Sequence, residues 1–215
     1  MKSLVIIGAG GHGREVLDVV EAINAVEPTY EVLGFLADRD GAHEPLTRRT
    51  TKILGPTSLI DSMKAEYIVA IGDPVARADI DGRFMLKGLV SPVLIHPAAS
   101  VGSDVHLGPG SVVMAGARIT TNLVAGRSLQ VNVNATISHD GRIGDYVTIS
   151  PGCNISGNVE LGDNVYLGTG CVIIPGIRIG ANTMVGAGAV VIHDLPSGVT
   201  AVGVPAKPLA RRVAE

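Results

Sequence analysis

This 215-residue chain has few aromatic side chains and no strong excess of positive or negative charge. Phe, Tyr and Trp together make up 3% of it and Trp is absent, which predicts a narrow core filled by aliphatic side chains. A formal net charge of −3 creates no basic field, so neither nucleic acid nor a membrane surface is expected as a partner. No uncharged run of about eighteen apolar residues occurs, which argues against a membrane-spanning helix. The chain opens on a short strand rather than on a signal peptide, so we expect a cytoplasmic protein.

What the chain has in abundance is an aliphatic residue at every sixth position from Ile95 to Val191. Ile, Leu or Val fills sixteen of these seventeen positions, with Ala125 as the exception, and the fifth position of each hexad is also small or apolar. Gly, Asn or Asp recurs between them, where a corner requires a left-handed backbone. A fixed short period indicates stacked units, so the hexads predict a parallel β-helix with three short strands in each coil.

A change in sequence texture near residue 90 divides the chain into two domains. We predict an N-terminal domain over residues 1–88, a linker over 89–94, the β-helix over 95–196 and a C-terminal tail over 197–215. No hexad carries an insertion, so the β-helix has no long loop of its own from which to build a pocket. The chemistry is therefore expected from corner residues and from neighbouring subunits.

The two cysteines, Cys153 and Cys171, both occupy inward positions and lie one predicted coil apart. We expect their side chains to stack in the core as reduced thiols, although a disulfide is conceivable by distance. Neither is predicted to be a nucleophile, and no metal site is expected.

The N-terminal domain is predicted to be a small Rossmann-like α/β unit. Apolar runs predict strands over residues 4–7, 31–36 and 67–71, and the segments 14–24 and 74–85 predict helices.

The turn after the first strand is rich in glycine, and Gly8, Gly10 and Gly13 fit the dinucleotide fingerprint, in which backbone N–H groups approach a pyrophosphate. Because the domain has room for only half of an NAD fold, we predict a single nucleotide diphosphate here, with NAD-dependent redox chemistry as the alternative. His12, which follows Gly11 in this turn, is predicted to donate to a phosphate; capping of the helix is the alternative.

Two carboxylates at strand ends are the other candidates for this nucleotide site. Asp38 ends the second strand, where it could accept hydrogen bonds from a ribose or a base. Asp73 ends the third strand and, like Arg14, is either solvated or structural, or else lines the sugar-nucleotide site.

His139 differs from the other histidines because it lies at a mid-helix corner with a carboxylate, Asp140, immediately after it. Four others are interpreted as surface, loop or corner residues: His43, His96, His106 and His193. Acetyl transfer from a thioester to an amine needs a group that takes the amine's proton, and an imidazole with an ordinary pKa of about 6.5 suits that step. A neighbouring carboxylate can fix the tautomer, although corners favour Asp in any case.

Five segments together resemble the nucleotide-sugar acetyltransferases of the hexapeptide-repeat family. They are IIGAGGHGREVLDV near the start, VAIGD at a strand end, the unbroken hexads, NATISHD in mid-helix and GVPAKPLAR near the end. The family includes enzymes that N-acetylate nucleotide-linked 4-amino-4,6-dideoxy sugars and the related sialic acid O-acetyltransferases. The resemblance spans nearly the whole chain and implies a left-handed β-helix, acetyl-CoA as co-substrate and a homotrimer with active sites between subunits.

The resemblance also implies roles for individual residues. His139 matches the family's general base, with Asp140 beside it, and Asn132 matches an asparagine that contacts the substrate across the subunit boundary. Gly157 resembles a position whose backbone meets the pantetheine or acetyl group of coenzyme A. Lys207 lies in the segment near the coenzyme A nucleotide and could pair with its phosphates, or be an ordinary solvated lysine.

The family places the nucleotide diphosphate of the sugar on the N-terminal domain, at the glycine turn with His12 and at Asp38. Some relatives carry a second histidine nine residues after the base, where this chain has Thr148. That difference argues against a two-histidine scheme.

We therefore predict an acetyl-CoA-dependent N-acetyltransferase acting on the 4-amino group of a nucleotide-linked 4-amino-4,6-dideoxy sugar. GDP-perosamine or a UDP-linked analogue is the expected substrate, and O-antigen biosynthesis is the expected setting. The alternatives are O-acetylation of a sialic acid or another sugar, and a non-catalytic trimeric scaffold that binds a nucleotide sugar.

Overall fold

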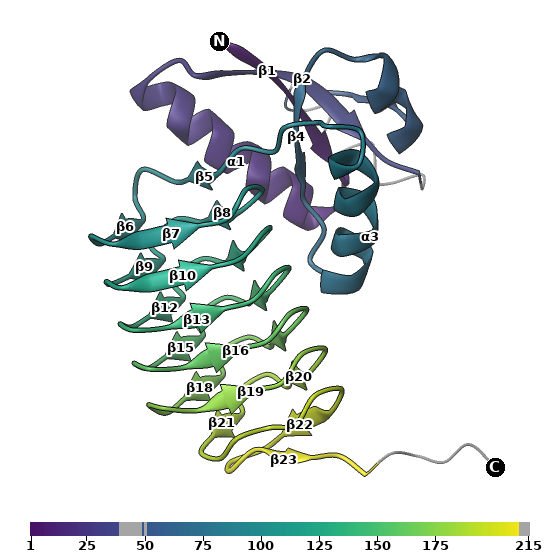
Figure 1. Cartoon of the computed structure of the whole chain (residues 1–215). Helices are drawn as coiled ribbons and strands as arrows, with labels where there is room; N and C mark the ends of the chain where they lie inside the picture. The colour runs from purple at the N-terminus through teal and green to yellow at the C-terminus, as the bar shows by residue number, and fades with distance from the viewer. Residues whose placement is uncertain (39–48, 50, 211–215) are drawn as a thin grey trace, which may run out of the picture.

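A computed structural model describes residues 1–38, 49 and 51–210 of the chain. His43 and residues 211–215 of the predicted tail lie outside this range. The described residues form a small α/β domain that sits on one end and one face of a β-helix (Figure 1).

The N-terminal domain contains a parallel four-stranded sheet in the order β3-β2-β1-β4. Its strands are β1 (Lys2–Ile7), β2 (Tyr30–Leu36), β3 (Ile53–Gly55) and β4 (Glu66–Val69). Helix α1 (Gly11–Val26) covers one face, while α3 (Pro74–Met85) and the 3₁₀ helix η1 (Thr57–Ser62) lie on the other. The Rossmann-like prediction is confirmed, with β3 and η1 added and α1 beginning three residues earlier than expected.

The alternation of side chains along β1 explains the three layers. Leu4 and Ile6 point to the α1 side, where they pack with Val16 and Val20. Val5 and Ile7 point to the other side and pack with residues of α3 and η1. A strand buried on both faces is hydrophobic throughout, as parallel sheets require.

The hexads form a left-handed parallel β-helix with three flat faces. Face 1 contains β5 (Leu94–Ile95), β8 (Val112–Val113), β11 (Gln130–Val131), β14 (Thr148–Ile149), β17 (Tyr166–Leu167), β20 (Met184–Val185), β22 (Thr200–Val202) and β23 (Lys207–Pro208). Face 2 contains β6 (Ser100–Val101), β9 (Arg118–Ile119), β12 (Thr136–Ile137), β15 (Asn154–Ile155), β18 (Val172–Ile173) and β21 (Val190–Val191). Face 3 contains β7 (Val105–Leu107), β10 (Leu123–Ala125), β13 (Arg142–Ile143), β16 (Glu160–Leu161) and β19 (Arg178–Ile179).

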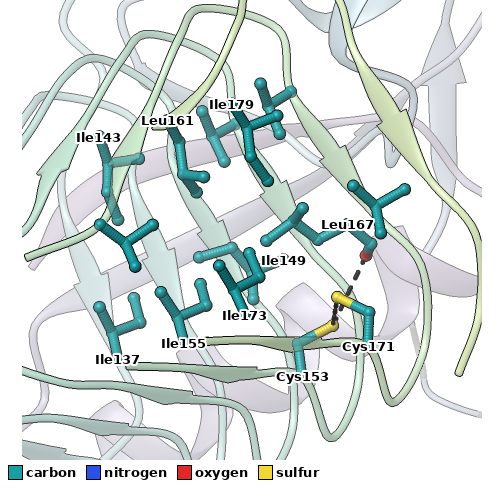
Figure 2. Close-up of a cluster of buried hydrophobic side chains, with 14 of the residues drawn as sticks. Ile137, Ile143, Ile149, Cys153, Ile155, Leu161, Leu167, Cys171, Ile173 and Ile179 are labelled. Atoms are coloured by element: carbon teal, nitrogen blue, oxygen red, sulfur yellow. Dashed lines mark hydrogen bonds between the residues drawn. The ribbon is translucent and has the colours of Figure 1, made fainter. Parts of the chain in front are cut away.

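The aliphatic residues that lead the hexads fill the interior of this β-helix, except Ile95 of the first hexad, which is 37% exposed. Ile137 pairs in register with Ile155, and Ile155 with Ile173, so identical side chains stack from coil to coil (Figure 2). Cys153 and Cys171 stack in the same core as free thiols, with their Sγ atoms 3.5 Å apart. The buried side chains from Val113 to Ala201 form a continuous column of dispersion contacts, whereas Val101 and Leu107 near the start of the β-helix are only partly buried.

Corner residues adopt the left-handed conformation that the sequence predicted. Asn122, Asp140 and Asn158 lie one above another at the corner between faces 2 and 3, with φ values of 53°, 58° and 57°. Asn and Asp tolerate this conformation better than other non-glycine residues, which explains their recurrence.

The N-terminal domain covers the first coils of face 1 of the β-helix, whereas Met184 and Val202 on later strands of that face are exposed. Helix α1 lies between the parallel sheet and the first coils (Figure 1), and its apolar residues share one core with Leu94, Val112 and Met114. Leu94, in the segment predicted as a linker, is fully buried in β5. Residues 200–202 and 207–208, in the predicted tail, add β22 and β23 to face 1.

Candidate active site

His139 and Asp140 occupy the corner between β12 on face 2 and β13 on face 3. The imidazole Nδ1 lies 2.7 Å from Oδ2 of Asp140, and Nδ2 of Asn122, one coil earlier, donates to Oδ1 of the same carboxylate over 3.1 Å. Hydrogen bonds from His139 and then from Asn122 lower the pKa of Asp140, so the carboxylate is charged at neutral pH. A charged carboxylate only accepts, so Nδ1 of His139 must carry its hydrogen.

The tautomer that this contact selects leaves the Nε2 lone pair of His139 available as a base. The imidazole is 56% exposed, so Nε2 is accessible from outside this chain. This geometry would allow His139 to accept a proton and Asp140 to orient the ring and stabilise the resulting imidazolium, so their catalytic roles stay a prediction.

Gly157 lies directly beyond the imidazole, one coil along. A Cβ atom at this position would lie 2.6 Å from Cε1, 2.8 Å from Nε2 and 3.0 Å from Nδ1 of His139. Only glycine leaves space for the ring where it now lies. The backbone around Gly157 is held by the ladder, because Asn158 N donates to His139 O over 2.9 Å.

The N-terminal domain has a pocket of about 900 Å³ at the carboxyl ends of its strands. We call it the N-terminal pocket; its lining residues that carry the argument are Gly8, Gly10, Asp38, Ile71, Asp73 and Arg83. The first turn of α1 opens at Gly10 with no side-chain cap and no acidic residue. Uncapped amides and the positive end of a helix favour an anion such as a diphosphate.

Asp38 and Asp73 line this pocket, but each also has a structural partner. Oδ1 and Oδ2 of Asp38 accept hydrogen bonds from N and Oγ1 of Thr57 at 2.7 and 2.9 Å. Asp73 caps α3 by accepting from Ala76 N over 2.7 Å. Each carboxylate oxygen keeps lone pairs that these donors do not use.

His12 lies elsewhere than its predicted role suggests. It does not line the pocket; its Nε2 bonds Oε1 of Gln130 on the β-helix, and its Nδ1 lies 3.4 Å from Glu15. Burial lowers the pKa of His12, which favours the neutral ring. The ring already has a hydrogen-bond partner on the β-helix, 118 residues away in the sequence. Its predicted contact with a phosphate stays a prediction.

Of the two remaining glycines of the turn, only Gly13 is required by close packing. A Cβ on Gly13 would lie 1.9 Å from Gly8 O, so glycine at this position lets α1 approach the end of β1. Gly11 opens α1 and does not line the pocket.

Asn132 and Lys207 are not close to His139 along the coil. Asn132 follows β11 at the corner between faces 1 and 2, where it is buried and donates to Ile149 O over 2.8 Å. Lys207 is exposed on β23 at the far end of face 1. Their predicted contacts with substrate and coenzyme A stay predictions.

One chain does not bring His139 and Asp140 together with the N-terminal pocket. The pocket belongs to the domain on face 1, whereas His139 lies at the corner opposite that face. A shallow groove of about 540 Å³ lies on face 3, lined by Arg142, Glu160 and Arg178 among others, and His139 is not part of its lining.

Sequence reasoning missed the polar residues that join the two domains. Arg77 on α3 is fully buried, and Asp81 one turn later bonds Arg127, Tyr67 and Tyr146. In the sequence both residues are ordinary members of a helix with no obvious apolar stripe. The β-helix partners Arg127 and Tyr146 lie 46 and 65 residues from Asp81, so no local signal could have found these contacts.

Two absences hold for the residues that the structure describes. No helix among them is long and apolar enough to cross a membrane. The same residues contain no group of three or more His, Cys, Asp or Glu side chains that could hold a metal ion.

Two family models match the chain. The model for the PglD N-terminal domain matches residues 3–83, and the model for the bacterial transferase hexapeptide, six repeats, matches residues 140–174 and 158–193. The first match covers the N-terminal domain with its pocket, and the second begins at Asp140 and runs along the β-helix.

Solved structures are similar over nearly the whole chain. The acetyltransferase domain of PglB from Neisseria gonorrhoeae, solved in complex with acetyl coenzyme A, is 37% identical, with 97% of this chain and 99% of that chain covered and a TM-score of 0.87. PerB from Caulobacter crescentus, solved with CoA and GDP-perosamine, is 33% identical, with 98% of each chain covered and a TM-score of 0.87. Perosamine N-acetyltransferase from that organism has also been solved with the same ligands and one histidine replaced by asparagine or alanine.

A further relative is the GDP-perosamine N-acetyltransferase of Escherichia coli O157:H7. It is 31% identical over 153 residues, which cover 68% of this chain and 66% of that protein. The aligned segment therefore spans just under two thirds of that relative's length.

Proposed function

Because the chain belongs to the family of hexapeptide-repeat sugar N-acetyltransferases with a PglD-like N-terminal domain, we propose that it transfers the acetyl group of acetyl-CoA to the amine of a nucleotide-linked amino sugar. The acceptor is the 4-amino group of a 4-amino-4,6-dideoxy sugar, such as GDP-perosamine or a UDP-linked analogue. The single observation that carries this proposal is the exposed imidazole of His139, fixed by Asp140 with Nε2 left as a base.

In the proposed reaction the neutral amine attacks the thioester carbonyl, and the nitrogen must then lose a proton. Nε2 of His139 takes that proton while Asp140 balances the charge on the ring. The tetrahedral intermediate collapses with loss of the coenzyme A thiolate, which the imidazolium can protonate. The ring then returns to the tautomer with its hydrogen on Nδ1, ready for another cycle.

The nucleotide diphosphate of the sugar occupies the N-terminal pocket in this proposal. The glycine turn and the uncapped start of α1 offer N–H groups to the phosphates, while Asp38 at the end of β2 faces the ribose or base. Acetyl-CoA binds along the β-helix near Gly157, with Lys207 near its phosphates. The pocket volume of about 900 Å³ suits a nucleotide-sized ligand.

The proposed assembly is a homotrimer in which neighbouring chains complete each site. The separation of His139 from its own chain's pocket supports this, because a reacting sugar must touch both. Asn132 contacts the substrate across the subunit boundary. A cytoplasmic location fits the supply of acetyl-CoA and nucleotide sugars that this reaction needs.

An acetyl-CoA consumption assay against GDP-, UDP- and dTDP-linked 4-amino sugars tests the proposal. We expect turnover of one nucleotide series and a fall of about 10²-fold or more in kcat/KM for His139→Asn, because a general base contributes that much. His106→Asn is the matched control, since His106 also pairs with an aspartate at the surface, Asp104, 3.1 Å away. The His106→Asn variant should have the same kcat/KM as the wild type.

Turnover of none of the amino sugars, with coenzyme A still bound, would refute the N-acetyl proposal and favour a hydroxyl acceptor. Equal activity of the His139→Asn and His106→Asn variants would refute the role of His139. Absence of any acetyl-CoA binding would favour a non-catalytic scaffold.

A further inference from the structure

The turn between β4 and α3, which forms one wall of the N-terminal pocket, is held from behind by the β-helix. Oγ1 of Thr148 donates to Gly72 O over 2.8 Å, and Nε2 of Gln130 donates to Val69 O over 3.0 Å. Thr148 and Gln130 stand on adjacent strands of face 1, β14 and β11, and are 3% and 1% exposed. Two buried polar side chains of the β-helix thus end on backbone carbonyls of the other domain.

Arg77 joins the same turn to two corners of the β-helix. Its Nη1 donates to Ile71 O and Gly72 O at 2.8 and 3.2 Å. Its other nitrogens donate to carbonyls of the corners between faces 3 and 1, at Ser128, Tyr146 and Val147. The guanidinium is fully buried, and its planar set of donors fixes the direction of every carbonyl it meets.

The carbonyls held in this way lie next to the residues that shape the pocket. Ile71 and Asp73, on either side of Gly72, both line it, and Asp73 caps the helix whose Ala76 and Ile80 form the adjoining wall. A rotation of the Gly72 peptide would therefore move both the turn and the start of α3. The conformation of this wall depends on bonds that originate outside the N-terminal domain.

Gln130 also contacts the opposite side of the pocket, where the glycine turn leads into α1. Oε1 of Gln130 bonds Nε2 of His12 in the first turn of α1, while Nε2 of Gln130 donates to Val69 O at the end of β4. One side chain of the β-helix thus bridges the glycine turn and the β4 end.

We propose that Thr148, Gln130 and Arg77 are positioning residues of the nucleotide-sugar site, through which the β-helix sets the shape of the N-terminal pocket. This inference rests on the proposed function, because it requires that pocket to hold the nucleotide diphosphate. It gives Thr148, at the position where some relatives have a second histidine, a role in substrate binding rather than in proton transfer.

The test compares Thr148→Val, which keeps the shape and loses the hydroxyl, with Thr148→Ser, which keeps the hydroxyl. Calorimetric titration of the full chain with GDP, UDP, dTDP and CoA measures each affinity. Loss of one buried hydrogen bond should weaken binding of the preferred nucleotide about 3- to 10-fold in Thr148→Val. The affinity for CoA should be unchanged, and Thr148→Ser should bind the nucleotide as wild type does.

Thr183→Val provides the matched control. Thr183 is also a buried β-helix threonine, and its Oγ1 donates to a backbone carbonyl, Pro196 O, over 2.7 Å, but its partner lies within the β-helix. It should lower the melting temperature as much as Thr148→Val does and leave nucleotide affinity unchanged. Gln130→Met, which removes both of its bonds, should weaken nucleotide binding in the same selective way.

Unchanged nucleotide affinity in Thr148→Val and Gln130→Met would overturn the inference while leaving the proposed function standing. Equal weakening of nucleotide and CoA binding, or failure of Thr148→Ser to restore affinity, would also overturn it, because either result indicates a general loss of structure. A wild-type chain that binds CoA but none of GDP, UDP and dTDP would contradict the proposed function of the pocket and this inference with it.

Discussion

Replacing Gly157 with alanine should displace the proposed base without unfolding the protein. The new Cβ would lie 2.6 Å from Cε1 of His139, whereas non-bonded carbons normally approach to about 3.5 Å, so the ring must move by about 1 Å. The ring is a half-exposed side chain that is free to rotate away, and Gly157 does not have a positive φ, so alanine adds no backbone strain.

The structural cost of this substitution is therefore small and the catalytic cost large. A shift of 1 Å in a reacting group costs on the order of 10²-fold in rate, while the free energy of unfolding should change by less than about 1 kcal/mol. The shift also breaks the 2.7 Å contact between Nδ1 and Asp140, so the tautomer is no longer fixed.

The assay measures kcat with saturating acetyl-CoA and amino sugar, together with the melting temperature. Gly82→Ala is the control, because a Cβ on Gly82 in α3 meets nothing within 4 Å. It should stabilise the helix by about 0.5–1 kcal/mol and leave kcat unchanged. Wild-type kcat in Gly157→Ala would refute the claim that His139 acts from its present position.

Two other predictions concern buried and exposed carboxylates. Hydrogen bonds from the imidazole of His139 and then from Asn122 lower the pKa of Asp140. Asn122→Gly, in which glycine tolerates the same φ, should therefore raise the pKa of Asp140 toward its ordinary value. An unchanged titration of the Asp140 carboxyl by NMR would contradict this. Asp81→Asn should cost about 2–3 kcal/mol in urea unfolding, because it leaves the largely buried guanidinium of Arg127 without its charged partner. A cost below about 0.5 kcal/mol, typical of surface sites, would show that this ion pair does not join the domains.

The sequence predicts the β-helix well because the repeat follows from backbone geometry. Each corner needs a left-handed residue and each turn of the coil returns inward positions to the same place, so the period is visible without knowledge of distant contacts. The contact between His139 and Asp140 was predictable for the same reason, since adjacent corner residues share a local geometry. Gly157 was predicted by resemblance as a coenzyme A contact, which stays a prediction; the structure shows instead that its missing Cβ leaves space for the ring.

The residues that sequence reasoning misplaced or missed depend on contacts between the domains. His12 has the context of a phosphate ligand in its glycine turn, but Gln130 on the β-helix takes its Nε2. In the sequence, Thr148 stands out only because some relatives have a histidine at that position. Its hydrogen bond to Gly72 O joins residues that are 76 positions apart. Such pairs become visible only when the docking of α1 and α3 on face 1 is known.

The most direct test of the central claim, that each site combines His139 of one chain with the N-terminal pocket of another, is complementation between two inactive variants. His139→Asn removes the base, and Gly10→Asp places a carboxylate at the diphosphate end of the pocket while remaining a favourable residue before α1. Co-expressed in equal amounts, the two should form mixed trimers in which about one quarter of the sites have both parts intact. Activity near a quarter of wild type is the predicted result; no activity in the mixture, despite assembly, would mean that both parts must come from the same chain and would contradict the account.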